Sequence, residues 1–130
     1  MTKNRVRQFL LLGVAAVFLL EAGVALVNPG AGAARVGYEV SGPDGLSEYR
    51  AVYLGMFGAL GIATLFAAWN VTEPLLADVI CLAIAAEAVA RLVGVLIDGV
   101  PGNVHLLNIA AESCAFIIFM IRPSPPQPAV

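Results

Sequence analysis

The sequence predicts an all-α fold, a single-domain bundle of four transmembrane helices over residues 1–130. Sixty per cent of the residues are hydrophobic and only 12% are charged, whereas soluble domains carry roughly twice that charged fraction. A soluble domain of this size could not bury so much apolar surface, because small domains keep much of their surface exposed. Lipid must therefore cover it, and the apolar runs approach the roughly 20 residues that a spanning helix needs.

Four apolar runs are separated by residues that commonly end or start helices. Asn28-Pro29-Gly30 stops the first run, Pro74 suits the first turn of the third, and a tight turn is expected over residues 98–102. The expected spans cover residues 8–27, 49–69, 74–97 and 103–121.

The remaining segments are predicted to be irregular. Residues 28–48 form a loop that is longer than a connection requires, and a short strand within it is expected over residues 35–40. The tail over residues 123–130 contains four prolines, and we expect it to be disordered or extended.

Basic residues in the flanks predict the orientation, because cytoplasmic flanks carry the excess of lysine and arginine. One side of the predicted bundle carries four such residues, Lys3, Arg5, Arg7 and Arg122. The other side carries Arg35 and Arg50. Both termini should therefore be cytoplasmic and residues 28–48 periplasmic, in a multi-pass protein of the bacterial inner membrane.

Ionisable residues recur within the expected spans at helical spacing. Glu87, Arg91 and Asp98 follow each other at intervals of four and seven, so they share a face on which Glu87 and Arg91 can pair directly. On the last helix, three polar residues are separated by three and four: His105, Asn108 and Glu112.

The polar positions also share one level of the membrane. Arg50 and Tyr53 occupy one face at the start of the second span, and Glu21 lies late in the first. Because alternate helices run in opposite directions, all these groups fall at the midplane or in the outer half. We predict a polar, ligand-binding pocket that opens towards the periplasm and is lined by Glu21, Arg50, Tyr53, Glu87, Arg91, Asp98, His105, Asn108 and Glu112.

The charges of this predicted pocket do not balance. Four carboxylates (Glu21, Glu87, Asp98, Glu112) face two guanidinium groups (Arg50, Arg91). That imbalance is unfavourable in a low dielectric. A carboxyl group stays protonated, His105 becomes charged, or a cation or amine ligand completes the set. Glu112 is the expected protonated group, because it is deep and lacks a basic neighbour in sequence.

A purely structural interpretation remains open, in which these pairs only fix helix register. No spacing typical of a metal site or a nucleic-acid-binding surface occurs, and no cofactor is expected. Cys81 and Cys114 fall in apolar runs and are expected to act as small hydrophobic residues.

Three motifs resemble a known family. They are Glu48-Tyr49-Arg50-Ala51-Val52-Tyr53, the segment Ala90-Arg91-Leu92-Val93-Gly94 with Asp98-Gly99-Val100-Pro101 after it, and Glu112. Over nearly its whole length the chain is similar to the bacterial membrane family called domain of unknown function 4345. The resemblance implies a four-helix membrane protein without an established activity, and its signature falls on Arg50, Tyr53, Arg91, Asp98, Gly99 and Pro101.

The predicted function is binding of a small polar or amphiphilic ligand, in a role related to transport. Arg50 and Arg91 would orient an anionic or carbonyl group, while Glu87, Asp98 and Glu112 would set the proton balance. One alternative is an accessory subunit of a larger membrane complex, packed through small-residue faces. Another is a membrane enzyme acting on lipid or quinone, with His105 and a carboxylate as acid and base. No catalytic motif is visible, so binding is favoured over catalysis, with membrane lipid and other copies or subunits as expected partners.

Overall fold

The chain is helical throughout the part that the structure describes. This computed structural model covers residues 2–123, with all side chains in that range except those at positions 103, 104, 107 and 114. Its elements are α1 (Lys3–Val27), α2 (Pro29–Arg35), α3 (Gly42–Arg50), the π-helix η1 (Ala51–Met56), α4 (Phe57–Trp69), α5 (Pro74–Asp98) and α6 (Asn103–Met120).

Three helical stretches are long and apolar enough to cross a membrane: Lys3–Val27, Gly42–Trp69 and Pro74–Asp98. The middle stretch combines α3, η1 and α4 without a break. Many large apolar side chains on these stretches face outward, among them Leu20, Leu75 and Leu96, which are 68%, 76% and 85% exposed. The protein is therefore a multi-pass membrane protein. The shorter helix α6 has 18 residues, and its apolar part covers Asn108–Met120.

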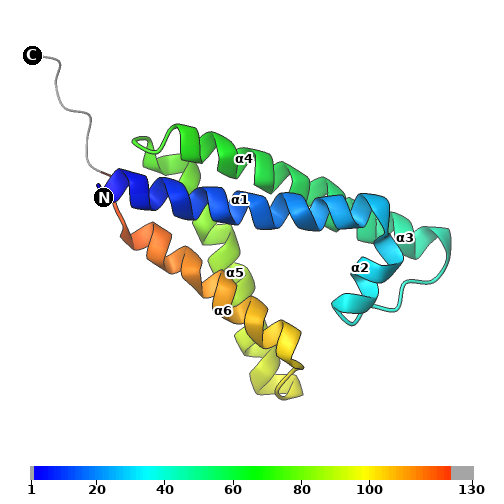
Figure 1. The fold of residues 1–130 in the computed structure, drawn as a ribbon. Coiled ribbons are helices and arrows are strands. Elements are labelled where there is room, and N and C mark those ends of the chain that lie inside the picture. The colour runs from blue at the N-terminus through cyan, green and yellow to red at the C-terminus, as the bar shows by residue number, and fades with distance from the viewer. Residues whose placement is uncertain (1, 124–130) are drawn as a thin grey trace, which may run out of the picture.

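The helices form two antiparallel pairs that diverge from one end of the molecule (Figure 1). Helix α1 packs along α4, and α5 packs against α6. The pairs meet where α1 begins and α6 ends, and they separate towards the α5–α6 turn. The end where they meet is called the closed end below.

Small and apolar residues make the main core. It includes Leu11, Phe18, Ala68, Ile84 and Ile118, which come from four helices. Helix α4 approaches α1 so closely that a Cβ at Gly61 would lie 2.8 Å from Leu19 side-chain atoms. Glycine at this position therefore permits the backbone contact, as small residues commonly do between membrane helices.

Residues 28–48 do not form the expected loop. The side chain of Asn28 accepts a hydrogen bond from the Ala31 amide, and Pro29 occupies the first turn, so a new helix starts directly after α1. The chain then turns at Gly37, whose φ is +77°. The predicted strand over residues 35–40 is wrong: residues 2–123 contain no strand, so no partner could satisfy its backbone. The tail beyond Pro123 lies outside the described residues.

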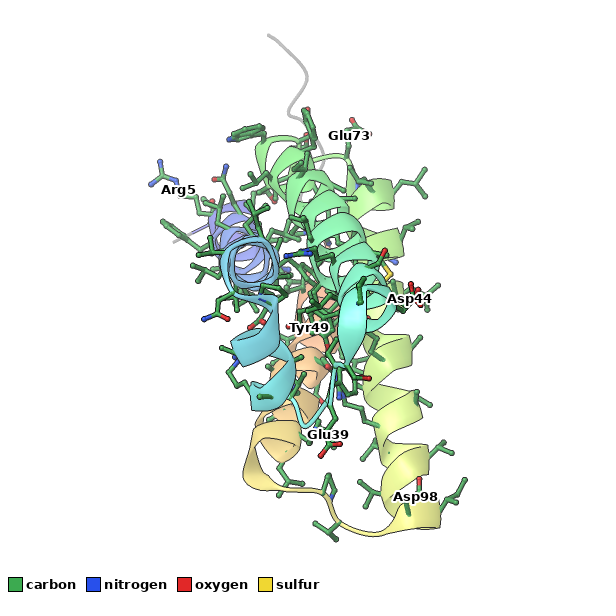
Figure 2. The ribbon with its side chains drawn as sticks, turned by 90° about the vertical axis from the view of Figure 1, so that its right-hand side faces the viewer. Arg5, Glu39, Asp44, Tyr49, Glu73 and Asp98 are labelled. Carbon is green, nitrogen blue, oxygen red and sulfur yellow. The ribbon has the colours of Figure 1, made fainter. Side chains whose placement is uncertain are left out.

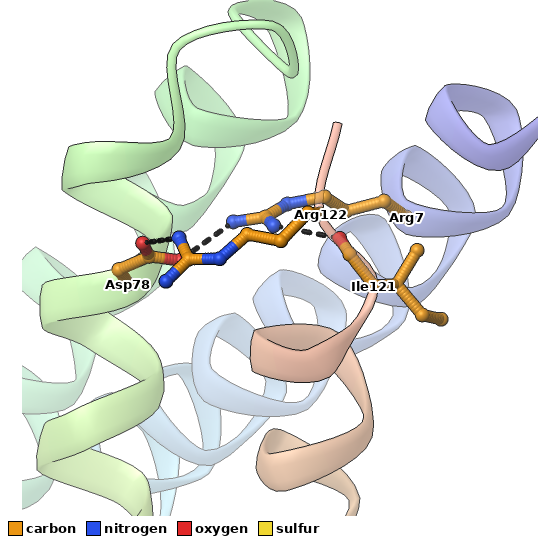
Figure 3. Close-up of polar contacts among 4 residues, drawn as sticks. All are labelled: Arg7, Asp78, Ile121 and Arg122. Atoms are coloured by element: carbon orange, nitrogen blue, oxygen red, sulfur yellow. Dashed lines mark hydrogen bonds and ion pairs between the residues drawn. The ribbon is translucent and has the colours of Figure 1, made fainter. Parts of the chain in front are cut away.

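A buried arginine holds the closed end together (Figure 3). The side chain of Arg7 is fully buried, donates to Asp78 Oδ1 on α5 at 3.0 Å, and donates to the Ile121 carbonyl oxygen at 2.8 Å. Arg122 pairs with the other carboxylate oxygen of Asp78. Three segments that are distant in sequence are thus joined, and both ends of the described chain lie together.

This cluster yields a stability prediction. Asp78→Ala should lower the free energy of unfolding by about 3–5 kcal/mol, because it leaves the buried Arg7 charge unpaired. Arg122→Gln should cost about 0–1 kcal/mol, since that side chain is 57% exposed. Reversible unfolding in mixed micelles measures both. Equal effects of the two substitutions would show that Arg7 is not the buried partner.

Candidate functional site

A cavity of about 330 Å³ lies between the two helix pairs. Every element except α3 contributes to its walls. Helix α1 presents one continuous face to it, with Leu10, Val14, Val17 and Glu21 at intervals of three and four. At 1.5 Å per residue, that face extends about 17 Å along the helix axis.

The lining changes from apolar to polar along this length. Towards the closed end it consists of Leu10, Gly13, Val14, Phe18, Ile84 and Ala115. Towards the opposite end it includes Glu21, Arg35, Tyr53, Glu87, Arg91, Asn108 and Glu112, together with apolar Val36 beside Arg35. The cavity is therefore amphipathic along its own axis.

Arg91 and Glu112 form the ion pair that links α5 to α6 in the cavity wall. The Nε atom of Arg91 donates to both carboxylate oxygens of Glu112, at 2.8 and 3.0 Å. The sequence spacing predicted that Arg91 would pair with Glu87, but Arg91 turns to the neighbouring helix instead. Glu112 thus has a basic partner, which removes the reason for expecting it to be the protonated group.

Arg35 supplies the second guanidinium of the cavity, and sequence reasoning missed it. Arg35 ends α2 and pairs with Glu21 on α1. This hydrogen bond raises the pKa of Arg35, so the group stays charged. The sequence does contain evidence for α2: Asn28 can cap a helix and Pro29 suits its first turn. In the prediction from sequence, these two residues instead start a loop.

Small residues position α2 so that Arg35 reaches the cavity. Ala25, Ala33, Val36 and Tyr49 form a second core between α1, α2 and α3. A Cβ at Gly32 would lie 2.6 Å from the Tyr49 hydroxyl oxygen. Glycine therefore allows the short helix to rest against this tyrosine.

Glu87 is the cavity carboxylate that has no basic partner. Its side chain lines the cavity, yet no described residue makes a hydrogen bond or ion pair with it. The two cavity arginines are each engaged by another carboxylate, Glu21 or Glu112.

Aromatic rings form a continuous series of contacts, of which Phe18, Tyr53 and Phe57 line the cavity. Tyr49 stacks on Tyr53 at 4.4 Å, Tyr53 lies 5.0 Å from Phe57, and Phe57 meets Phe18 edge-on at 5.2 Å. Tyr53 lies within η1, where i→i+5 bonding widens the turns. The residues at 49, 53 and 57 consequently share one face.

Three predicted site residues lie away from the cavity. Arg50 is exposed and lines a shallow depression on α3 instead, since the aromatic stripe occupies the inner face. Asp98 is exposed at the end of α5, far from Tyr49 (Figure 2). His105 Nε2 would lie 3.9 Å from a Cβ at Gly37, which places His105 beside the α2–α3 segment.

The other six predicted site residues are brought together around the cavity: Glu21, Tyr53, Glu87, Arg91, Asn108 and Glu112. That they bind a ligand stays a prediction. Within the described residues, no group of three or more His, Cys, Asp or Glu side chains is placed to hold a metal ion. Cys81 is a buried free thiol, and the Cys114 side chain lies outside the described part.

These features define the class as a helical, multi-pass membrane protein with ion pairs between its apolar helices. The chain belongs to the family described as domain of unknown function (DUF4345), whose model matches residues 6–121. No curated protein and no solved structure matches the chain.

A double-mutant cycle tests which carboxylate holds Arg91. Arg91→Met and Glu112→Gln should show a coupling energy of about 0.5–3 kcal/mol, because the two groups are hydrogen-bonded. The same cycle with Glu87→Gln should give a clearly smaller value. Unfolding in mixed micelles provides the energies, and stronger coupling to Glu87 would mean that Arg91 pairs within its own helix.

Proposed function

We propose that this protein binds a small polar or amphiphilic ligand in the cavity between its two helix pairs, in a role related to transport. The observation that carries the proposal is the graded lining of that cavity. Its apolar part could hold a hydrocarbon group, and its charged part could hold a polar head. Ligand sites in proteins are commonly such apolar cavities with a few convergent polar groups.

The cost of the charged lining supports a functional interpretation. Ionisable side chains at membrane depth are unfavourable by about 2.5–3.5 kcal/mol each on insertion scales, and they commonly mark ligand or ion sites. The Arg91–Glu112 pair alone could fix helix register. Glu87 contributes nothing to such a register, because no described residue pairs with it.

We further propose that the protein lies in a bacterial inner membrane with both termini in the cytoplasm. The hydrogen bond from Arg7 to the Ile121 carbonyl holds the two ends of the described chain on one side. Lys3, Arg5 and Arg122 are at that end, as expected of a cytoplasmic face. In this orientation α6 is the fourth crossing, and the charged part of the cavity faces the periplasm.

Two alternatives follow from other features of the chain. An accessory subunit of a membrane complex would pack laterally against its partners through faces of small residues. A membrane enzyme acting on lipid or quinone would need an acid and a base at the ligand. His105, the predicted acid–base residue, does not line the cavity, so the enzymatic alternative has less support.

Filling the cavity tests the proposal. A Cβ at Gly13 would meet no heavy atom within 4 Å, so Gly13→Leu adds a side chain to the cavity without a clash at that atom. With octyl probes in lipid nanodiscs, methyl NMR signals of Val14 and Ile84 should shift in the natural sequence. In Gly13→Leu the affinity should fall by about tenfold, or 1.4 kcal/mol.

Gly23→Leu is the matched control. Gly23 lies on the same helix, is equally unobstructed and does not line the cavity. Its variant should bind the probes normally, and the methyl groups of exposed Leu82 should report only partition into lipid. Equal loss in both glycine variants, or equal shifts at Leu82 and Val14, would contradict binding in the cavity.

A further inference from the structure

We infer that the ligand carries a positively charged ammonium group on an apolar chain, and that Glu87 is the residue that holds this charge. The inference rests on the proposed function and specifies the class of ligand for the same cavity. Three observations support it: the charge balance of the cavity, the position of Glu87 along it, and the aromatic residues in its lining.

The charge balance of the cavity favours a cation. Its walls contain three carboxylates (Glu21, Glu87, Glu112) and two guanidinium groups (Arg35, Arg91), which leaves one negative charge when all are ionised. Two ion pairs use both guanidinium groups and two of the carboxylates. The remaining carboxylate is Glu87, which is half-buried, and when it is ionised a charge between apolar helices without a partner is costly. A bound cation would supply that partner.

The position of Glu87 fits an amphiphile. On α5 it lies three residues from Ile84, in the apolar part, and four residues from Arg91, in the polar part. An ammonium group at Glu87 would therefore stand at the boundary between the two parts. Its hydrocarbon chain could extend beside Val14 and Ile84 towards the closed end, where the walls are apolar.

Aromatic rings in the same cavity supply a second kind of group that attracts an ammonium ion. Tyr53 and Phe57 line the cavity from the α4 side, while Glu87 lines it from α5. Cations are attracted to the faces of aromatic rings, and desolvation strengthens the attraction. A carboxylate and aromatic rings that line one cavity together provide the groups that recognise primary or quaternary ammonium.

An anionic ligand fits the same walls less well. To bind it, Arg35 or Arg91 would have to leave a carboxylate that already engages it. The freed carboxylate and Glu87 would then both repel the ligand. This differs from the prediction that Arg50 and Arg91 orient an anionic group, because Arg50 lies outside the cavity and Arg91 is already paired with Glu112.

The test compares three octyl probes that differ only in their head: octylamine, octanol and octanoate. Titrations of the full chain in phosphatidylglycerol nanodiscs follow the methyl signals of Val14 and Ile84, with empty nanodiscs correcting for partition. Octylamine should bind most tightly and octanoate most weakly. Glu87→Gln should weaken octylamine by at least about tenfold and leave octanol unchanged.

Asp98→Asn is the control for general charge effects, since Asp98 is exposed on the same helix and outside the cavity. It should leave the affinity for octylamine unchanged. Similar affinities for octylamine and octanol in the natural sequence would overturn the inference, even if the Glu87 variant failed to fold. Tighter binding of octanoate than of octylamine would also overturn the inference.

The outcomes separate this inference from the proposed function. If octanol or octanoate binds in the cavity at least as tightly as octylamine and Gly13→Leu removes that binding, the cavity is a ligand site and only the ammonium inference fails. If no probe depends on Gly13, both fail. Adding phosphatidylethanolamine to the nanodiscs distinguishes the source: competition with octylamine indicates a lipid headgroup, and its absence indicates a free amine.

Discussion

The structure depends on one constraint: a charged side chain within an apolar helix bundle must be met by protein rather than by lipid. Arg7 satisfies it at the closed end, where it is fully buried against Asp78 and the Ile121 carbonyl. Arg91 satisfies it within the bundle through Glu112. The first contact ties α1, α5 and the end of α6 together, and the second ties α5 to α6. Between these two contacts the helix pairs separate, and the cavity occupies that space.

Local sequence explains how α1 is held on two sides. Gly61 lets α4 lie against Leu19 of α1, so this pair is tight. After the end of α1, Pro29 starts α2, which rests on Tyr49 and carries Arg35 to Glu21. Polar groups of α1, α2, α5 and α6 therefore gather around one part of the cavity. Glu87 lines the cavity without a hydrogen-bonded partner among the described residues, and the inferred preference for an ammonium ligand depends on it.

Much of this arrangement is predictable from helical periodicity. The third span was expected at 74–97 and is Pro74–Asp98, because a proline start and a glycine stop flank a continuous apolar run. Glu21, Glu87, Arg91 and Glu112 were expected at one level because antiparallel helices alternate in direction. Partners between helices could not be predicted in this way. Sequence spacing pairs Arg91 with Glu87 on the same helix, but in the structure Arg91 binds Glu112 on α6. The excess of basic residues in the flanks places Arg7 in water, but in the structure Arg7 is buried against Asp78 and the Ile121 carbonyl.

The contact between Arg91 and Glu112 is the most direct test that acids and bases from separate helices meet inside the protein. Solid-state NMR dephasing between ¹⁵Nε of arginine and ¹³Cδ of glutamate in lipid bilayers measures it. The account predicts strong dephasing, since Nε lies 2.8 and 3.0 Å from the two Glu112 oxygens, and predicts a marked decrease in Glu112→Gln, with the remainder due to the Arg35–Glu21 pair. Dephasing that is unchanged in Glu112→Gln and decreases in Glu87→Gln, or none at all, would contradict it.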